Sequence, residues 1–266
     1  MIGAIIGDIA GSRFEFHNYR KKDFTLFTKE CFPTDDSIMS LAVAKAVLEY
    51  KTNDANLSEA AVQWMQKIGR PYPACGFGGN FFDWIYSDHP KPYNSFGNGA
   101  AMRVSACGFA ANTLEEALQM SDSVTAVTHN HPEGIKGARA TTTAIFLAKT
   151  GVSIPEIRAH ITKQYYPLDF TIDAIRPTYR FNETCQDTVP QAIEAFLESN
   201  SFEDAIRTAV SVGGDSDTLA AITGSIAEAY YGVPQALYDA AVAYLDPLMR
   251  ELLHTFEAIY GTNVKA

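Results

Sequence analysis

Cysteine is scarce in this sequence and follows no metal-binding pattern. Four cysteines are scattered along 266 residues without C-x-x-C or C-x-x-H spacing (Cys31, Cys75, Cys107 and Cys185). This distribution favours reduced thiols over a disulfide framework. We therefore expect a cytoplasmic protein.

Runs of positive charge and long apolar runs are also absent. The net charge is −10, with no basic run that would attract nucleic acid or an anionic membrane non-specifically. No stretch of about eighteen uninterrupted apolar residues exists, which argues against a membrane span. The apolar stretch 1–16 has no basic leader and contains Asp8, so we interpret it as a buried helix rather than a signal peptide.

Apolar residues are numerous enough to bury a substantial core. They make up 47% of the chain, and no linker-like stretch divides it. We expect a single domain over residues 1–266, as a monomer or weak oligomer. Since basic runs are absent, a small polyanionic substrate would have to be met by metal ions and helix ends.

Strand-like alternation is scarce, and the spacing of apolar residues is helical along most of the chain. We predict an all-α fold of medium-length helices joined by short loops. The predicted helices span residues 2–12, 34–50, 57–68, 78–87, 98–111, 114–127, 133–149, 154–163, 189–198, 202–210, 215–231 and 235–259.

Two short acidic clusters are the most informative feature of the chain. Residues 34–36 read Thr-Asp-Asp and residues 215–218 read Asp-Ser-Asp-Thr, and each cluster opens a predicted helix with apolar residues directly behind it. Either cluster alone suits a helix N-cap, because Ser, Thr and Asp accept backbone N–H bonds there. Each supplies more oxygens than a cap needs, however, and carboxylates beside an apolar run require a partner.

The pair of clusters therefore favours a site for hard cations such as Mg²⁺, Mn²⁺ or Ca²⁺. Asp215 and Asp217 would diverge on a regular helix. Gly213 and Gly214 directly precede them and permit an irregular turn that aims both carboxylates at one point.

Glycine recurs every four residues in the first predicted helix, at Gly3, Gly7 and Gly11. Each interior glycine costs about 1 kcal/mol relative to alanine, so a close approach to another helix or to a ligand must offset the loss. We expect tight helix packing at Gly3 and Gly7.

Glu15 follows this helix, seven residues after Asp8. The two carboxylates share a helix face if the helix continues that far. We expect Phe14 and Phe16 to shield Glu15 from water, an environment that can tune the pKa of a carboxyl group.

Two further segments are rich in polar groups. Residues 94–103 form a glycine-flanked loop before a small-residue helix. Such a loop can bind phosphate or ribose oxygens through backbone N–H groups, although an ordinary turn fits this segment equally well. Residues 128–133 read Thr-His-Asn-His-Pro-Glu. We do not expect His129 and His131 to bind metal, because the oxygen-rich clusters are the better ligands for hard cations.

Five stretches together resemble the ADP-ribosylglycohydrolase family, which includes the dinitrogenase-reductase-activating glycohydrolase and the ADP-ribosyl-arginine and ADP-ribosyl-serine hydrolases. They are GAIIGDIAGSRFE (3–15), TDDSIMSLA (34–42), SFGNGAAMR (95–103), THNHPEGIKGA (128–138) and VGGDSDTLAAITGSIAEAYYG (212–232). They occur in the family's order, and the combination is far more specific than any single motif. The resemblance implies a compact all-α orthogonal multi-helix bundle with a central binuclear cleft that holds two Mg²⁺ or Mn²⁺ ions.

The resemblance also implies roles for individual residues. Glu15 matches the family's catalytic or gating glutamate, and Asp35 and Asp217 are the carboxylates expected to share in catalysis. The family's metal ligands fall on Thr34, Asp35, Asp36, Asp215, Asp217 and Thr218. Its ADP-ribose-binding loop falls on Phe96, Gly97, Asn98 and Gly99, with His129 near the adenosine end. Residues 150–190 match no motif and are the candidate region for substrate choice.

The implied activity is metal-dependent hydrolysis of the glycosidic bond between ADP-ribose and an acceptor, either a protein side chain or a small conjugate. Two alternatives belong to other classes. One is a metal-dependent hydrolase of another nucleotide or phosphate ester. The other is a non-catalytic ADP-ribose-binding module, which a loss of metal ligands would favour; none is lost here.

Overall fold

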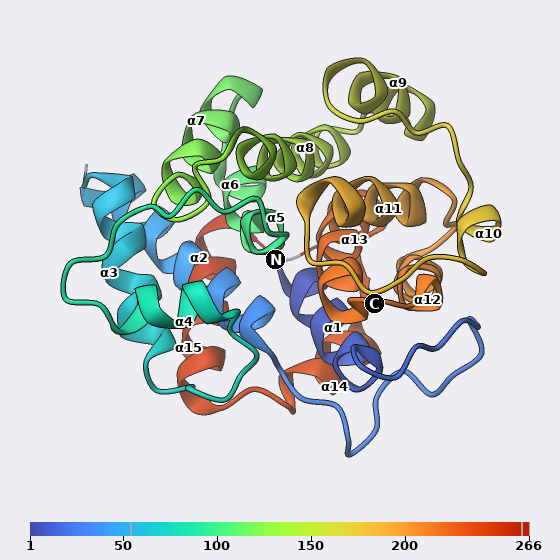
Figure 1. The fold of residues 1–266 in the computed structure, drawn as a ribbon, viewed down its shortest axis with the longest axis horizontal. Helices are drawn as coiled ribbons and strands as arrows, with labels where there is room; N and C mark the ends of the chain where they lie inside the picture. The colour runs from blue at the N-terminus through green and yellow to red at the C-terminus, as the bar shows by residue number, and fades with distance from the viewer. Residues whose placement is uncertain (54, 262, 266) are drawn as a thin grey trace.

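Two helices from opposite ends of the sequence pack together at the centre of the structure. In the computed structural model, which describes residues 1–53, 55–261 and 263–265, these are α1 (Ile2–Gly11) and α13 (Ser216–Tyr231) (Figure 1). A Cβ atom on Gly3 or Gly7 would overlap the backbone of α13, and one on Gly11 would lie 2.5 Å from the Cα of Asp217. The predicted close packing at Gly3 and Gly7 is confirmed, and Gly11 has the same role.

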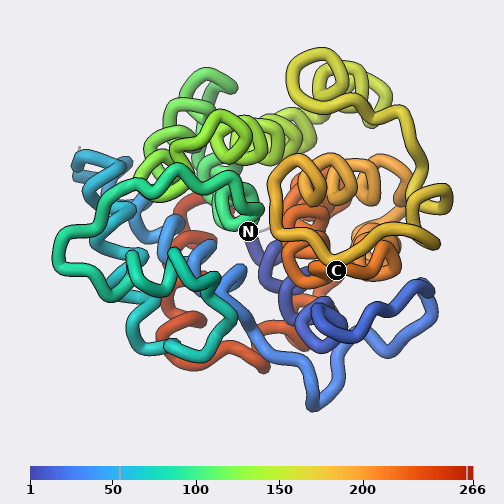
Figure 2. Tube along the Cα trace, in the orientation of Figure 1, coloured from blue at the N-terminus to red at the C-terminus, as the bar shows by residue number. Residues whose placement is uncertain are grey.

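Two groups of helices flank this central pair (Figures 1 and 2). One group holds α2 (Asp35–Asn53), α3 (Leu57–Gly69), α4 (Gly79–Tyr86) and α15 (Pro247–Tyr260). The other holds α9 (Ile154–Gln164), α10 (Ile172–Ile175), α11 (Cys185–Leu197) and α12 (Phe202–Val212). The remaining helices are η1 (Ser12–Phe14), α5 (Gly99–Met102), α6 (Ser105–Ala110), α7 (Leu114–Thr125), α8 (Pro132–Lys149) and α14 (Gln235–Val242).

The prediction of an all-α fold is confirmed. In the described part of the chain the only sheet is a parallel pair of two-residue strands, β1 (Val233–Pro234) and β2 (Val264–Lys265). Buried apolar side chains from nearly all the helices form one continuous core. No described helix combines the length and the apolar character that a membrane crossing requires.

Three helix predictions were wrong in detail, and one helix was not predicted. The predicted helix 98–111 is two short helices, because the backbone at Arg103 and Val104 leaves the helical region. The predicted helix 235–259 is also divided, at Pro247, where Asp246 caps α15 by accepting a bond from Met249 N. The helix predicted from residue 189 begins at Cys185 and contains Pro190, and α10 was not predicted.

Candidate active site

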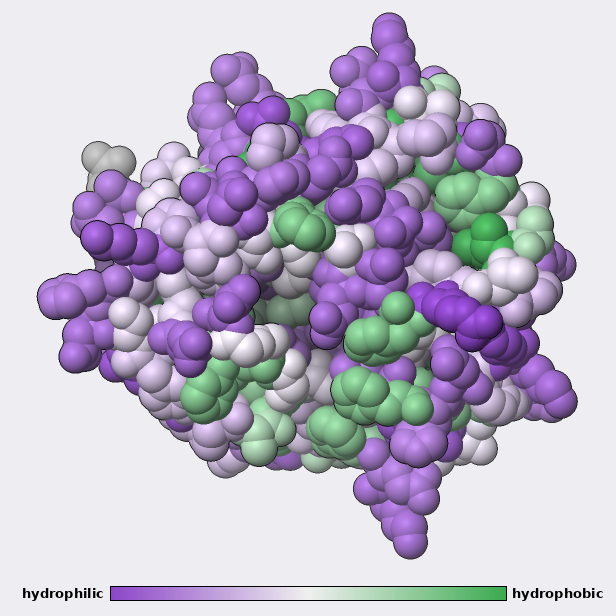
Figure 3. Space-filling model, in the orientation of Figure 1, coloured by the Kyte–Doolittle hydropathy of each residue, from purple (hydrophilic) through white to green (hydrophobic). Residues whose placement is uncertain are grey.

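A cleft of about 260 Å³ brings together segments that lie far apart in the sequence. It contains carboxylates of both acidic clusters, Glu15, the 95–103 loop and His129. Figure 3 shows this face of the molecule, which is hollowed near its centre and bears apolar residues along one edge of the hollow. The structure therefore places most of the predicted site residues around one space.

Local backbone geometry brings the two acidic clusters to the cleft. Gly213 and Gly214 have φ angles of +80° and +72°, which side-chain-bearing residues rarely adopt. This turn places Asp215 at the N-cap of α13 and Asp217 in its first turn. Asn98 Nδ2 donates a 2.6 Å hydrogen bond to Asp215 Oδ2, which ties the glycine loop to the second acidic cluster.

Asp8 is a fully buried carboxylate that organises the first cluster. Its oxygens accept hydrogen bonds from Thr34 N (2.9 Å), Thr34 Oγ1 (2.7 Å), Ser37 N (3.0 Å) and Ser37 Oγ. These bonds flank Asp35 and Asp36 on both sides and fix the start of α2. The hydroxyl of Thr34 is directed at Asp8, and Thr34 does not line the cleft. No pattern in the sequence indicated this role for Asp8, although the residue lies within the matched stretch 3–15.

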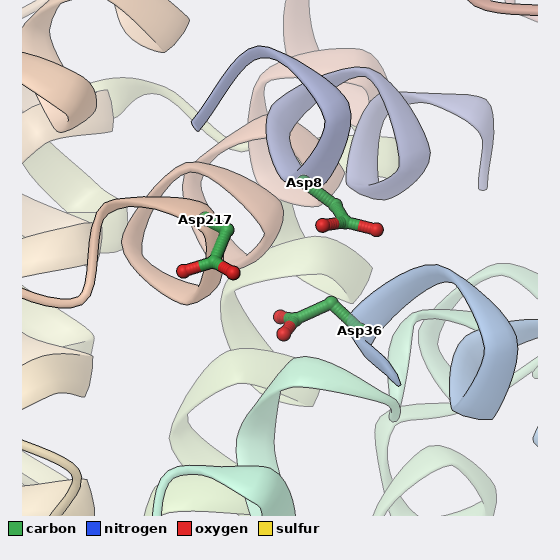
Figure 4. Close-up of side chains that lie close together, drawn as sticks. All are labelled: Asp8, Asp36 and Asp217. Carbon is green, nitrogen blue, oxygen red and sulfur yellow. The ribbon is translucent and has the colours of Figure 1, made fainter. Parts of the chain in front are cut away.

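Carboxylates from α1, α2 and α13 converge on a common space (Figure 4). One oxygen from each of Asp8, Asp36 and Asp217 lies within 4.8 Å of the other two, and the same holds for Glu15, Asp215 and Asp217. Asp36 Oδ1 and Asp217 Oδ1 are buried without a hydrogen-bond partner among the described residues. Buried unpaired carboxylate oxygens are costly unless a cation faces them. The residues present therefore fit a site for divalent ions with oxygen ligands.

The electrostatics of the acidic cluster support this interpretation. Burial, followed by repulsion from neighbouring carboxylates, raises the pKa of Asp36 and of Asp217 well above the usual range. Burial also raises the pKa of Asp8 to about 6, against the hydrogen bonds from Ser37 and Thr34 that lower it. Without a counter-charge, the protein accumulates negative charge that it would partly neutralise by binding protons.

Glu15 lies in the turn that follows η1, so α1 does not continue regularly to it. Burial, together with the charge of Asp215, raises its pKa to about 7. Phe14 is buried and stacks on Tyr19 at a centroid distance of 5.0 Å. Phe16 is 74% exposed, so the expectation that it shields Glu15 was wrong.

The glycine loop forms the opposite side of the cleft. Its backbone is held by the segment before α11: Asn98 N donates to Glu183 O (2.7 Å), and Cys185 N donates to Phe96 O (2.9 Å). Gly97, Asn98, Gly99 and His129 line the cleft. Phe96 instead borders an adjacent groove, together with Phe181.

Several cleft residues were not predicted from the sequence, among them Glu183, Arg103, Tyr93 and residues from the segment 76–81. Glu183 lines the cleft from the end of the 150–190 region, which carried no recognisable motif. Arg103 ends the matched stretch 95–103 and is fully buried beside His129. The only signal for Arg103 in the sequence is its position as a basic residue at the end of a motif of mostly small residues.

Comparisons with known proteins reveal similar sequences and a similar fold. A family model described as ADP-ribosylglycohydrolase matches residues 1–260. The ADP-ribosylarginine hydrolase Tri1 of Pseudomonas putida is 27% identical, over 88% of this chain and 70% of its own length. The ADP-ribosylhydrolase ARH3 of Mus musculus is 23% identical, over 88% of this chain and 83% of its own. A solved structure, "ADP-ribosylglycohydrolase-related protein complex", has the same fold, with a TM-score of 0.70 at 20% identity over 97% of this chain and 94% of that one.

Proposed function

Because the chain belongs to the ADP-ribosylglycohydrolase family, we propose that it is a hydrolase that cleaves the glycosidic bond between ADP-ribose and an acceptor. Hydrolysis adds water across this bond: the hydroxyl goes to the ribose and the proton to the acceptor, and both phosphates stay on ADP-ribose. The observation that carries the proposal is one cleft in which converging carboxylates face a glycine loop and His129.

The acidic side of the cleft suits two divalent ions, Mg²⁺ or Mn²⁺. The proposed ligands are Thr34, Asp35, Asp36, Asp215, Asp217 and Thr218. The unpaired oxygens of Asp36 and Asp217 support this choice. Thr34 does not line the cleft, so we propose that it acts through a lone pair of the hydroxyl that donates to Asp8. Asp8 belongs to one of the two groups of converging carboxylates and Glu15 to the other, so both lie close to the proposed ligands. When bound, such ions supply positive charge that orients ribose hydroxyls and makes water more acidic.

The protein's own residues then have distinct proposed roles. Glu15 accepts a proton from the attacking water or supports the developing positive charge on the ribose, and its raised pKa suits proton transfer near neutral pH. Asp35 and Asp217 share in catalysis from the cluster. The Phe96–Gly99 loop and His129 bind ADP-ribose, with Asn98 connected to Asp215 through its side chain.

Two broader expectations belong to the same proposal. The family match over residues 1–260 supports one domain over residues 1–266. The four cysteines are free thiols, which supports a reducing cytoplasmic compartment. The substrate is an ADP-ribosylated protein or a small ADP-ribose conjugate.

Product analysis by mass spectrometry tests the function. The wild-type protein with Mg²⁺ or Mn²⁺ is incubated with peptides that carry ADP-ribose on arginine, serine or another side chain. We expect free ADP-ribose from at least one peptide and no release after chelation. Release of AMP or inorganic phosphate would indicate a nucleotide or phosphate-ester hydrolase. ADP-ribose binding without turnover on any conjugate would indicate a binding module.

A further inference from the structure

Arg103 is a fully buried cation that lines the cleft on the side of the glycine loop. Its relative exposure is 0%, and no carboxylate in the described part of the chain lies within ion-pair distance of it. Burial lowers its pKa to about 10, so the guanidinium remains charged at neutral pH. A buried charge without an ionic partner is expensive, which indicates a function beyond packing.

The guanidinium contacts two neighbouring side chains at the edge of the cleft. Arg103 Nη2 donates to Thr128 Oγ1 at 2.6 Å and lies 3.4 Å from His129 Nδ1. Thr128 Oγ1 lies 2.7 Å from the same Nδ1 and 3.5 Å from Thr125 O. Thr128 is completely buried, so these three side chains form a closed arrangement.

This arrangement determines where the imidazole carries its proton. Arg103 is only a donor, so it occupies a lone pair of the Thr128 hydroxyl and leaves that hydroxyl's hydrogen to point elsewhere. The nearest acceptor for this hydrogen is His129 Nδ1. A proton on Nδ1 would instead face the guanidinium N–H. We infer that Arg103 is a positioning residue that, through Thr128, fixes His129 as a neutral imidazole with its proton on Nε2.

The other ring nitrogen is presented to the cleft. A Cβ atom on Gly97 or Gly99 would lie 3.5 or 3.3 Å from His129 Nε2, so the two glycines leave space in front of that nitrogen. An Nε2–H group donates to a hydroxyl or phosphate oxygen, whereas a bare Nε2 would accept from a hydroxyl and repel a phosphate oxygen. The inference rests on the proposed function in one respect: the oxygen belongs to ADP-ribose, as a hydroxyl or phosphate oxygen.

The surroundings keep the ring neutral. Burial and then the charge of Arg103 lower the pKa of His129 well below its usual range. Tyr93 also packs on the ring, at a centroid distance of 5.9 Å, and its own pKa is raised to about 12 by burial, so it carries no charge. The imidazole therefore remains the same hydrogen-bond donor through the range in which a free histidine titrates.

Nitrogen NMR of the ¹⁵N-histidine-labelled, Mg²⁺-loaded full chain tests the inference without reference to turnover. The His129 signals are assigned by their loss in His129→Asn. We expect a protonated Nε2 and a bare Nδ1 that do not change between about pH 8 and 5.5, around the usual histidine pKa. A proton on Nδ1, or an imidazolium at pH 7, in the wild-type protein would overturn the inference whether or not any variant folds.

Variants then isolate Arg103. Arg103→Gln should mix the two tautomers and weaken ADP-ribose binding, measured by calorimetry, by about tenfold, the scale of one lost hydrogen bond. Arg103→Lys, which keeps the charge, should restore part of both readouts. The matched control is Arg139→Gln, since Arg139 pairs with Asp122 outside the cleft. If His129 keeps the wild-type tautomer in Arg103→Gln, the role of Arg103 is contradicted, even if the protein releases ADP-ribose. Conversely, a proton on Nε2 of His129 can be confirmed in a protein that releases no ADP-ribose.

Discussion

The two sides of the cleft differ in how they compensate buried charge. The acidic side gathers carboxylates from α1, α2 and α13, and two of its oxygens have no partner within the described chain. The opposite side holds one arginine and one neutral imidazole, joined by hydrogen bonds through Thr128. The first side is therefore incomplete without cations, whereas the protein assembles the second side from its own residues.

This difference separates two functions within one cleft. A side that depends on ions should lose activity, metal and stability together when a carboxylate is changed. A substitution on the side that is preformed by hydrogen bonds should weaken ligand binding, while the protein keeps its bound metal. The variants below use this contrast, from the largest expected effect to the smallest.

Asp217→Asn should have the largest effect on the acidic side. The change is nearly isosteric but replaces an anionic ligand with an amide that binds hard cations poorly. We expect turnover to fall by about 10²-fold or more with loss of bound metal. Kinetics and elemental analysis on the same sample measure both effects, with the exposed Asp169→Asn as the matched control. Wild-type turnover with full metal occupancy, and a stability change of about 1 kcal/mol or less, would instead mark Asp217 as a simple cap.

Glu15→Gln should separate proton transfer from metal retention. Glu15 belongs to the second carboxylate group, with Asp215 and Asp217, but lies outside both acidic clusters of the sequence. We expect turnover to fall about 10²-fold, the usual scale for a positioned acid or base, while metal content and ADP-ribose affinity are retained. A variant that loses its metal would place Glu15 among the ligands and refute the assigned role.

Gly11→Ala should disturb the acidic side through packing alone. The added methyl would lie 2.5 Å from the Cα of Asp217, at the start of α13. We expect a loss of about 1–3 kcal/mol in the free energy of unfolding and weaker metal binding. Gly79→Ala is the control, because no atom lies within 4 Å of its added Cβ. Equal melting temperatures for the two variants would be inconsistent with this packing.

Metal removal should make stability depend on pH. In the metal-free protein the pKa values of Asp8 and Glu15 are raised to about 6 and about 7, above the unfolded-state values near 4. Between about pH 4 and 7 the folded chain binds more protons than the unfolded chain, so the free energy of unfolding falls as pH rises. His129, whose pKa is lowered, acts in the opposite direction below about pH 6.5 but is a single group.

The gain in melting temperature on adding Mg²⁺ or Mn²⁺ should therefore be larger at pH 7 than at pH 5. Each additional kcal/mol by which the metal raises the free energy of unfolding corresponds to about 2–4 °C in melting temperature. Calorimetry with and without chelator measures the gain at each pH, and Zn²⁺ should not replace these ions. The same gain at both pH values would contradict the proposed compensation of carboxylate charge by metal.

The sequence predicted the acidic side better than the opposite side. The two acidic clusters and the glycines before Asp215 are local patterns, and the structure gives Gly213 and Gly214 the expected irregular turn. Asp8 was not predicted to bond Thr34 and Ser37, because those contacts join residues 26 and 29 positions apart.

The opposite side depends on contacts that no local pattern reveals. The hydrogen bonds of Asn98 with Glu183 and Asp215 span long stretches of sequence, so Glu183 could not be placed in the cleft beforehand. Similarly, the break at Arg103 is set by its burial beside Thr128 and His129 and not by a breaker residue. Helix content followed from periodicity, whereas helix ends and side-chain networks depended on tertiary contacts.

The most direct test of the central contrast is the number of divalent ions bound per chain. The wild-type protein and Asp217→Asn are dialysed against Mg²⁺ or Mn²⁺ and examined by elemental analysis, with Arg103→Gln as the variant from the opposite side. We expect two ions per chain in the wild type and in Arg103→Gln, and fewer in Asp217→Asn. Fewer than one ion per chain in a wild-type protein that still releases ADP-ribose, with a melting temperature unchanged by chelation, would contradict the account.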